Sequence, residues 1–144
     1  SNFLVKYGSQ KNKSNLDINS LKLESPIQSI AVSENKVFFA EKNNLLILDK
    51  LNFTWKRVKY NRKLINAFIF EIKFVRSNEN EEIIWLGTNK GAFLINLSKN
   101  YQLDFEEKNG LSSNIIYSLE ILDNEIWFGT SSGLCRFQWL NYLK

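Results

Sequence analysis

The chain has 144 residues, enough for one domain, and its 44% hydrophobic and 14% aromatic content can fill a core. It contains no histidine and one cysteine, Cys135, so an intrachain disulfide is excluded and a thiol nucleophile would lack an imidazole base. We expect neither an enzyme nor a metal or cofactor. No apolar run approaches the roughly 18 residues of a membrane span.

The net charge of +4 comes from basic residues that are spread along the chain. One group, between Lys56 and Lys63, alternates with apolar residues. A solvated strand edge, whose lysines prevent edge pairing, explains this group most simply. A phosphate-binding patch is the alternative, but the dispersed charge argues against a nucleic-acid partner.

Strand patterns follow one another in a fixed order. An alternating inner strand precedes a second strand centred on an aromatic residue, and a tight turn then leads to a third apolar strand and a more polar fourth one. Residues 65–75 could be read as a short helix, but their alternating end favours a strand. The inner strands are expected at 27–32, 70–75 and 116–121, the third strands at 45–48, 92–95 and 134–137, and the fourth at 53–58 and 101–105, with residues 3–7 resembling the fourth type.

The second strands and their turns form a repeat. Ile84–Gly91 returns 42 residues later as Ile126–Gly133, and Val37–Leu45 is a weaker copy with Phe38 for Trp and Asn44 for the second glycine. A strand, a glycine turn and a strand at a period in the forties are typical of a β-propeller blade. The sequence therefore predicts an all-β fold, a β-propeller fragment of about three four-stranded antiparallel blades. The approximate blades are 1–50, 51–97 and 98–144 of a single domain, 1–144.

Each repeated residue has a structural explanation. An aromatic side chain on the second strand fills the wedge between twisted blades, and the glycine after it lets a neighbour approach. The threonine can bond the turn backbone, and the second glycine supplies positive φ, a role that Asn44 would take in the first copy. The structural set is Trp85, Gly87, Thr88, Gly91, Trp127, Gly129, Thr130 and Gly133.

The stretch from Gly110 to Phe137 resembles the two-component regulator propeller repeat. It contains Gly-Leu-Ser-Ser-Asn, a hydrophobic inner strand, Ile126–Thr130 as the Trp strand and Gly133-Leu134 after the turn. The second copy matches over Ile84 to Leu94, and the first copy matches weakly. The resemblance implies a periplasmic sensor of a hybrid two-component system that responds to glycan fragments. The kinase would then lie beyond a membrane segment elsewhere in the parent protein. This step rests on analogy between propellers.

In such a propeller, the turns after the second strands and the loops that enter the next inner strand lie on one face. Amide and hydroxyl groups there suit the hydroxyls of an oligosaccharide, and lysines suit uronate or sulfate groups. A protein-interaction scaffold, with the basic segment meeting an acidic partner, is the alternative function. The candidate ligand-binding residues are Lys42, Asn43, Asn89, Lys90, Ser131, Ser132, Ser112, Ser113 and Asn114.

Three blades cannot close a ring, because propellers close at four to eight. We therefore expect a fragment of a longer propeller with an apolar inter-blade face at each end. Such faces drive association. Self-association is the expected result, with two chains completing a ring of six modules.

Overall fold

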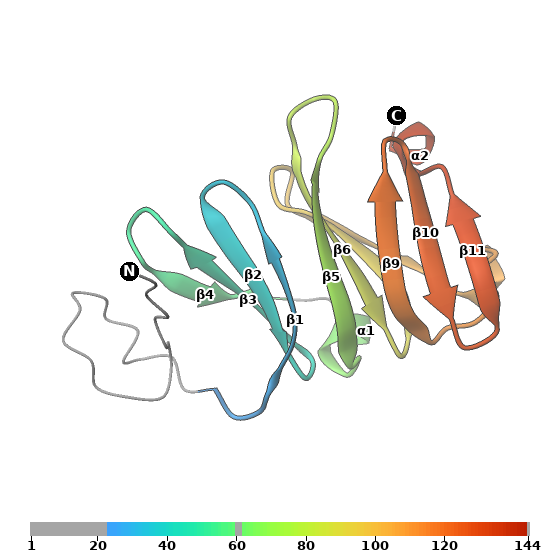
Figure 1. Ribbon diagram of the computed structural model, residues 1–144, viewed down its shortest axis with the longest axis horizontal. Coiled ribbons are helices and arrows are strands. Elements are labelled where there is room, and N and C mark those ends of the chain that lie inside the picture. Colours follow the sequence, from blue (N-terminus) through green and yellow to red (C-terminus); the bar gives the residue numbers. More distant parts are fainter. Residues whose placement is uncertain (1–22, 60–61, 144) are drawn as a thin grey trace, which may run out of the picture.

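The computed structural model describes residues 23–59 and 62–143. Three antiparallel sheets stand side by side in chain order (Figure 1). The expected all-β architecture is confirmed, while the expected strand at residues 3–7 lies outside the described residues. The first sheet holds β1 (Ile27–Val32), β2 (Lys36–Glu41), β3 (Asn44–Asp49) and β4 (Trp55–Arg57); the second holds β5 (Ile69–Arg76), β6 (Glu82–Thr88), β7 (Gly91–Asn96) and β8 (Tyr101–Phe105); the third holds β9 (Ile116–Leu122), β10 (Glu125–Thr130) and β11 (Gly133–Phe137).

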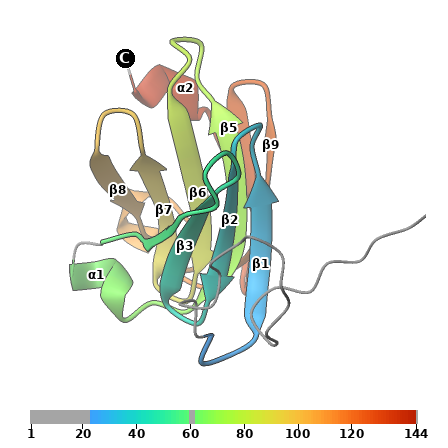
Figure 2. The ribbon, with the colours of Figure 1, turned by 90° about the vertical axis from the view of Figure 1, so that its left-hand side faces the viewer.

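The order of strands within each sheet follows the chain, with the first strand innermost. The inner strands β1, β5 and β9 pack against one another across the sheets (Figure 1). Figure 2 views this stack from the side of the first sheet. Because each sheet twists, neighbouring sheets meet at their inner strands and splay apart outward, which is the geometry of propeller blades.

The sheet boundaries differ from the modules expected at 1–50, 51–97 and 98–144. Each fourth strand hydrogen-bonds to the third strand before it, so the sheets span 27–57, 69–105 and 116–137. Within the described residues the third sheet has three strands rather than four. A single helical turn, α2 (Trp139–Tyr142), follows β11 instead, and another, α1 (Arg62–Ile65), precedes β5.

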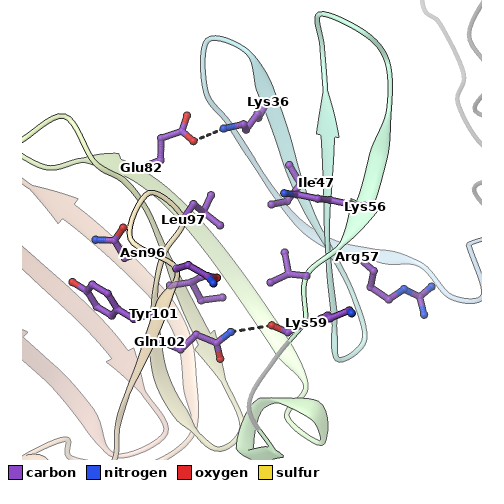
Figure 3. A pocket seen from close by; sticks show the side chains of 13 residues that line it. Lys36, Ile47, Lys56, Arg57, Lys59, Glu82, Asn96, Leu97, Tyr101 and Gln102 are labelled. Carbon is purple, nitrogen blue, oxygen red and sulfur yellow. Dashed lines mark hydrogen bonds and ion pairs between the residues drawn. The ribbon is translucent and has the colours of Figure 1, made fainter.

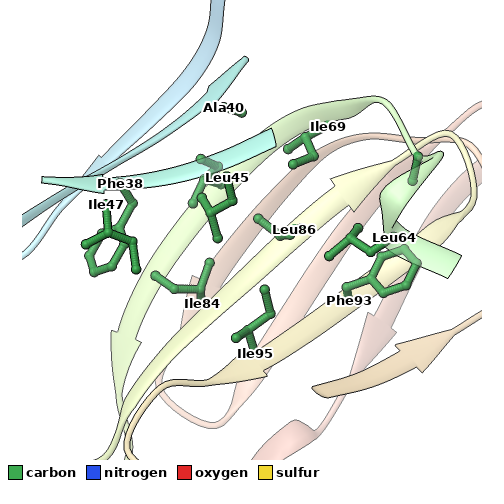
Figure 4. Close-up of a cluster of buried hydrophobic side chains, with 12 residues drawn as sticks. Phe38, Ala40, Leu45, Ile47, Leu64, Ile69, Ile84, Leu86, Phe93 and Ile95 are labelled. Atoms are coloured by element: carbon green, nitrogen blue, oxygen red, sulfur yellow. The ribbon is translucent and has the colours of Figure 1, made fainter. Parts of the chain in front are cut away.

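A first hydrophobic core lies between the first and second sheets (Figure 4). Phe38 of β2 is fully buried and stacks on Phe74 of β5, with ring centroids 5.4 Å apart. Leu64 of α1 closes one side of this core. Each large side chain buried here contributes roughly 1.5–3 kcal/mol of transfer free energy, so the two sheets are held together mainly by this layer.

A second core lies between the second and third sheets, and Trp85 is at its centre. The indole is fully buried and meets the rings of Phe105 and Phe128 at 5.4 and 5.8 Å. Trp139 of α2 packs edge-on to it at 6.2 Å and is also buried. The helical turn thus covers the outer part of this core, which no sequence pattern had indicated.

Trp127 occupies the same repeat position in a different environment. It lies on the face of the third sheet that points away from Trp85, and it is half-buried. The guanidinium of Arg136 lies 5.8 Å from the centroid of the Trp127 ring. The Nε1 of Trp127 donates to Glu125 at 3.2 Å. Within the described residues no fourth sheet follows to cover this indole.

The turns after the second strands repeat one hydrogen-bond pattern. The hydroxyl of Thr88 donates to the carbonyl of Gly91 at 2.7 Å, and that of Thr130 donates to Gly133 at 2.8 Å. Both glycines have positive φ, at 103° and 119°. In the corresponding turn of the first sheet the residue with positive φ is Lys42, at 52°, and not Asn44. The expectation for Asn44 was wrong because this turn, although it has the same two-residue length as the others, takes its left-handed conformation at its first residue and leaves Asn44 in the strand.

Candidate functional site

The turns expected to form a binding face do lie beside the loops that enter the next sheet. Asn43 donates from its amide to the carbonyl of Ile65. Asn89 accepts the N–H of Phe68 at 2.7 Å with its side chain and donates its own N–H to the carbonyl of Phe68 at 3.2 Å. Each turn is therefore tied to the segment that leads into the following inner strand.

The third turn is joined to the Ser-Ser-Asn loop in the same way. The hydroxyls of Ser113 and Ser131 are 2.6 Å apart, and those of Ser112 and Thr130 are 2.8 Å apart. The side-chain oxygen of Asn114 accepts the N–H of Glu107 at 2.8 Å. Most of these polar groups already bond within the protein and are less available to a ligand.

Six of the expected residues are exposed: Lys42, Asn89, Lys90, Ser112, Ser131 and Ser132. The side chains of Asn89, Ser112 and Ser131 take part in the hydrogen bonds described above, which leaves Lys42, Lys90 and Ser132 directed to solvent. Each belongs to a different turn, so they come from all three sheets. We call Lys42, Lys90 and Ser132 the turn face. It is a polar surface with two cations.

A larger feature is a hollow of about 800 Å³ between the first and second sheets. It is open where the outer strands β4 and β8 diverge (Figure 3). Glu82 begins β6 and lines this hollow, whereas the turn face follows the other end of β6. The two surfaces therefore lie toward opposite ends of the strands. We call this hollow the inter-sheet groove.

One wall of the inter-sheet groove is basic. Lys56, Arg57 and Lys59, on β4 and its exit, border the groove and are exposed. Lys56 lies on the face of β4 toward the second sheet because it pairs with the buried Ile47, whereas Arg57 pairs with Leu46 on the other face and points away from the opposite wall (Figure 3). Among the described residues, no carboxylate forms an ion pair with any of the three. In contrast, Lys36 on the same side is paired with Glu82 across the groove.

The opposite wall supplies the neutral amide of Gln102 in β8, which pairs with Ile95 on the face of the second sheet toward the groove. Asn96 and Tyr101 border the groove but point to the other face of that sheet, where Tyr101 packs in the second core and the buried Asn96 bonds Glu81. The amide nitrogen of Gln102 donates to the carbonyl of Lys59 at 3.1 Å and so connects the two walls (Figure 3). A lysine that faces an amide across the groove, with two more cations at the rim, could hold an anionic, hydroxyl-rich molecule.

Lys63 belongs to the same basic stretch of sequence but has a structural role. Its ammonium lies 2.5 Å from Asp104 and 3.0 Å from Glu106, which connects α1 to β8 and the residue after it. These hydrogen bonds raise the pKa of Lys63, and they are the main reason that the pKa of Glu106 is lowered. The basic segment therefore divides into a free part beside the groove and a paired part.

The sequence indicated the basic segment but not the groove. Nothing local to residues 56–59 indicates that Gln102 lies opposite, because the contact forms between two sheets. Among the described residues there is no group of three or more His, Cys, Asp or Glu that could hold a metal ion. Neither helical turn in the described ranges is long or apolar enough to cross a membrane.

Comparison with known proteins supports the propeller assignment. No family model matches the chain. Over 121 residues it is 32% identical to histidine kinase P4 of Formosa agariphila, an alignment that covers 78% of this chain and 9% of that protein. The chain is thus a distant homologue of a histidine kinase and spans only a small part of its length. This homology confirms the resemblance to the two-component regulator propeller repeat.

Two solved structures share the fold. The computationally designed protein Ika4, a propeller, is similar with a TM-score of 0.63 and 15% identity, over 81% of this chain and 68% of Ika4. The extracellular domain of BT4673 from B. thetaiotaomicron, assigned to a one-component system, has a TM-score of 0.61 and 20% identity, over 90% of this chain and 16% of that domain. At these identities the likeness establishes a propeller fold.

Proposed function

We propose that this chain is part of the extracytoplasmic sensor of a hybrid two-component signalling protein and senses glycan fragments in the periplasm. The observation that carries the proposal is the homology to a histidine kinase over most of this chain, in a segment that folds as propeller blades. Propellers commonly host binding surfaces rather than a single chemistry, so the ligand has to be argued from the surfaces themselves.

The inter-sheet groove is the surface best suited to a ligand. Lys56 faces into it with Arg57 and Lys59 at its rim, and these cations favour carboxylate or sulfate groups, while Gln102 places an amide on the facing wall. The turn face offers fewer groups, since most of the amides and hydroxyls expected to bind sugar bond within the protein. An acidic oligosaccharide such as an oligouronate is therefore the ligand class that we propose.

Calorimetric titration tests this ligand assignment on the full chain. We expect tetragalacturonate to bind and neutral xylotetraose not to bind. The Lys56→Gln/Arg57→Gln variant should bind tetragalacturonate at least about tenfold more weakly, because charged hydrogen bonds are lost. The matched control, Lys42→Gln/Lys90→Gln, removes the same charge from the turn face and should bind normally. Loss of binding in the control instead would move the site to the turn face.

A protein-interaction scaffold is the second candidate, and the exposed cations of β4 favour it because an acidic peptide could bind them. The gene around this segment distinguishes the two functions. A membrane segment and a histidine kinase encoded in the same reading frame would support the sensor. A reading frame without either, together with no binding of tetragalacturonate, would favour the scaffold.

A further inference from the structure

Every sheet presents the same set of positions toward the next one. We call the forward face the side that carries Phe38, Trp85 or Trp127, and the rear face the opposite side. On the forward face, Phe38 pairs across strands with Ala31 and Ile47. The corresponding partners are Lys73 and Leu94 for Trp85, and Glu120 and Arg136 for Trp127.

A second row on the forward face makes the contact between sheets directional. In the first sheet, the hydroxyl of Ser29 accepts the N–H of Ile72 from the second sheet at 3.0 Å. In the second sheet, Glu71 accepts the N–H of Leu119 from the third sheet at 2.6 Å. One side chain per sheet thus holds the inner strand of its successor by a main-chain hydrogen bond.

The third sheet has the same position, and it is occupied by Ser118. Ser118 pairs with Gly129, as Ser29 pairs with Ala40 and Glu71 with Gly87. Its side chain is exposed, and so is Leu134 on the same face, at 69%. Among the described residues, no inner strand lies against this forward face.

The first sheet offers the matching inner strand. Ile30 pairs with Phe39 at the position that Ile72 holds in the second sheet and Leu119 in the third. Ile30 and Val32 are 62% and 55% exposed, although their counterparts in the other sheets contribute to the two cores. Two large β-branched side chains on an inner strand are thus left open to solvent.

We propose that a second copy of this chain fills both open faces. The forward face of the third sheet of one copy binds the rear face of the first sheet of the other, and Ser118 accepts the N–H of Ile30. Ile30 and Val32 pack against Trp127 and Leu134, just as the second and third sheets pack through Trp85. Each of the two contacts in the dimer would have the same geometry as the two interfaces within one chain, which join the first sheet to the second and the second sheet to the third.

Ring closure favours a second copy over an unrelated partner. A head-to-tail interface either propagates or closes, and two copies related by a two-fold axis bury both open faces of each chain. Their six sheets fall within the four to eight blades at which propellers close. The interface uses the strand positions of the sheets alone and does not depend on the proposed function or on any ligand.

Sedimentation velocity of the full chain tests the interface. We expect a dimer of twice the 16.9 kDa chain mass. Ile30→Glu and Leu134→Glu should each be monomeric, since each blocks one of the two complementary faces. Leu51→Glu, at a position that is 74% exposed in the β3–β4 turn, is the matched control and should remain a dimer. Circular dichroism of each variant verifies that it is folded.

Mixing the two monomeric variants tests the head-to-tail arrangement. The Ile30→Glu chain keeps its forward face and the Leu134→Glu chain keeps its rear face, so labelled Ile30→Glu should bind unlabelled Leu134→Glu but not itself. Ser118→Ala should weaken wild-type association by roughly three- to tenfold per interface, the effect of one hydrogen bond. A monomeric wild-type chain, a dimeric Leu134→Glu variant or the absence of mixed binding would each overturn the proposal.

Discussion

Gly91 and Gly133 occupy the same place in two copies of one turn, but their surroundings differ. A Cβ atom built on Gly91 would lie 2.2 Å from the carbonyl oxygen of Phe105, whereas one on Gly133 would have no heavy atom within 4 Å. Both residues have positive φ, which disfavours any residue with a Cβ. The two positions therefore separate backbone strain from steric overlap.

We expect Gly133→Ala to lower the free energy of unfolding by about 1–2 kcal/mol, the cost of left-handed backbone alone. Gly91→Ala should cost at least about 3 kcal/mol, because β7 or β8 must also move. Urea denaturation followed by circular dichroism measures both. Equal losses in the two variants would show that the contact with Phe105 is not rigid.

The two repeat tryptophans show the limit of reading residues locally. Their sequence surroundings are nearly identical, and both were predicted to fill a wedge between blades. Trp85 is fully buried between two sheets, whereas Trp127 is half-buried under Arg136. Local sequence determines which face of a strand an indole occupies, but whether that face is covered depends on the next sheet.

At the level of single elements, Glu81 fixes the end of the β6–β7 hairpin. Its carboxylate bonds the ammonium of Lys99 and accepts the amide of the buried Asn96 at 2.7 Å. The hydrogen bond from Lys99, aided by that from Asn96, lowers the pKa of Glu81. The same pairing with Glu81 raises the pKa of Lys99.

A lowered folded-state pKa makes stability depend on pH in acid. The contribution of Glu81 is complete above the unfolded-state pKa, near 4.3, and is lost as the pH falls through the lower pKa of the folded protein. We expect the urea midpoint of the wild type to fall on going from pH 6 to about pH 3. Glu81→Gln should have a lower midpoint at pH 6 and a smaller fall in acid.

Glu34→Gln is the control for this measurement, because Glu34 is exposed in the β1–β2 turn. It should follow the wild-type curve. The acid-induced fall should be reduced but not abolished in Glu81→Gln, since Glu106 also has a lowered pKa. If the urea midpoint of Glu81→Gln fell between pH 6 and pH 3 by as much as that of the wild type, the ionisation of Glu81 would not contribute to the acid dependence of stability.

Strands were predicted far better than the elements that join or cover them. Alternation places β5 and β9 on the sequence, and the repeat places β6 and β10. The helical turn α2 was not predicted, because its four residues are too few to show a helical period. It is held by the packing of Trp139 against Trp85. The groove escaped prediction for a similar reason: its walls come from strands of two different sheets.

Across the whole molecule, the three sheets differ in how many of their faces are covered. The second sheet packs against a hydrophobic core on both sides, and every residue of β7 is buried. The third sheet has a core on one side, and two of its β11 residues are only half-buried while the rest are exposed. Stacked modules that contact only their neighbours gain stability from each interface. The second sheet should therefore undergo local unfolding less often than the other two sheets.

Hydrogen exchange measured by mass spectrometry on dilute protein tests this gradient. Amides of β6 and β7 should exchange most slowly, by roughly tenfold or more relative to those of β10 and β11, because opening them breaks both cores. At higher concentration, association through the open faces would slow exchange in β1 and β9 in particular, since these inner strands would form the interface. Equal protection of all three sheets in dilute protein would mean instead that the chain unfolds as one cooperative unit, with both cores breaking together.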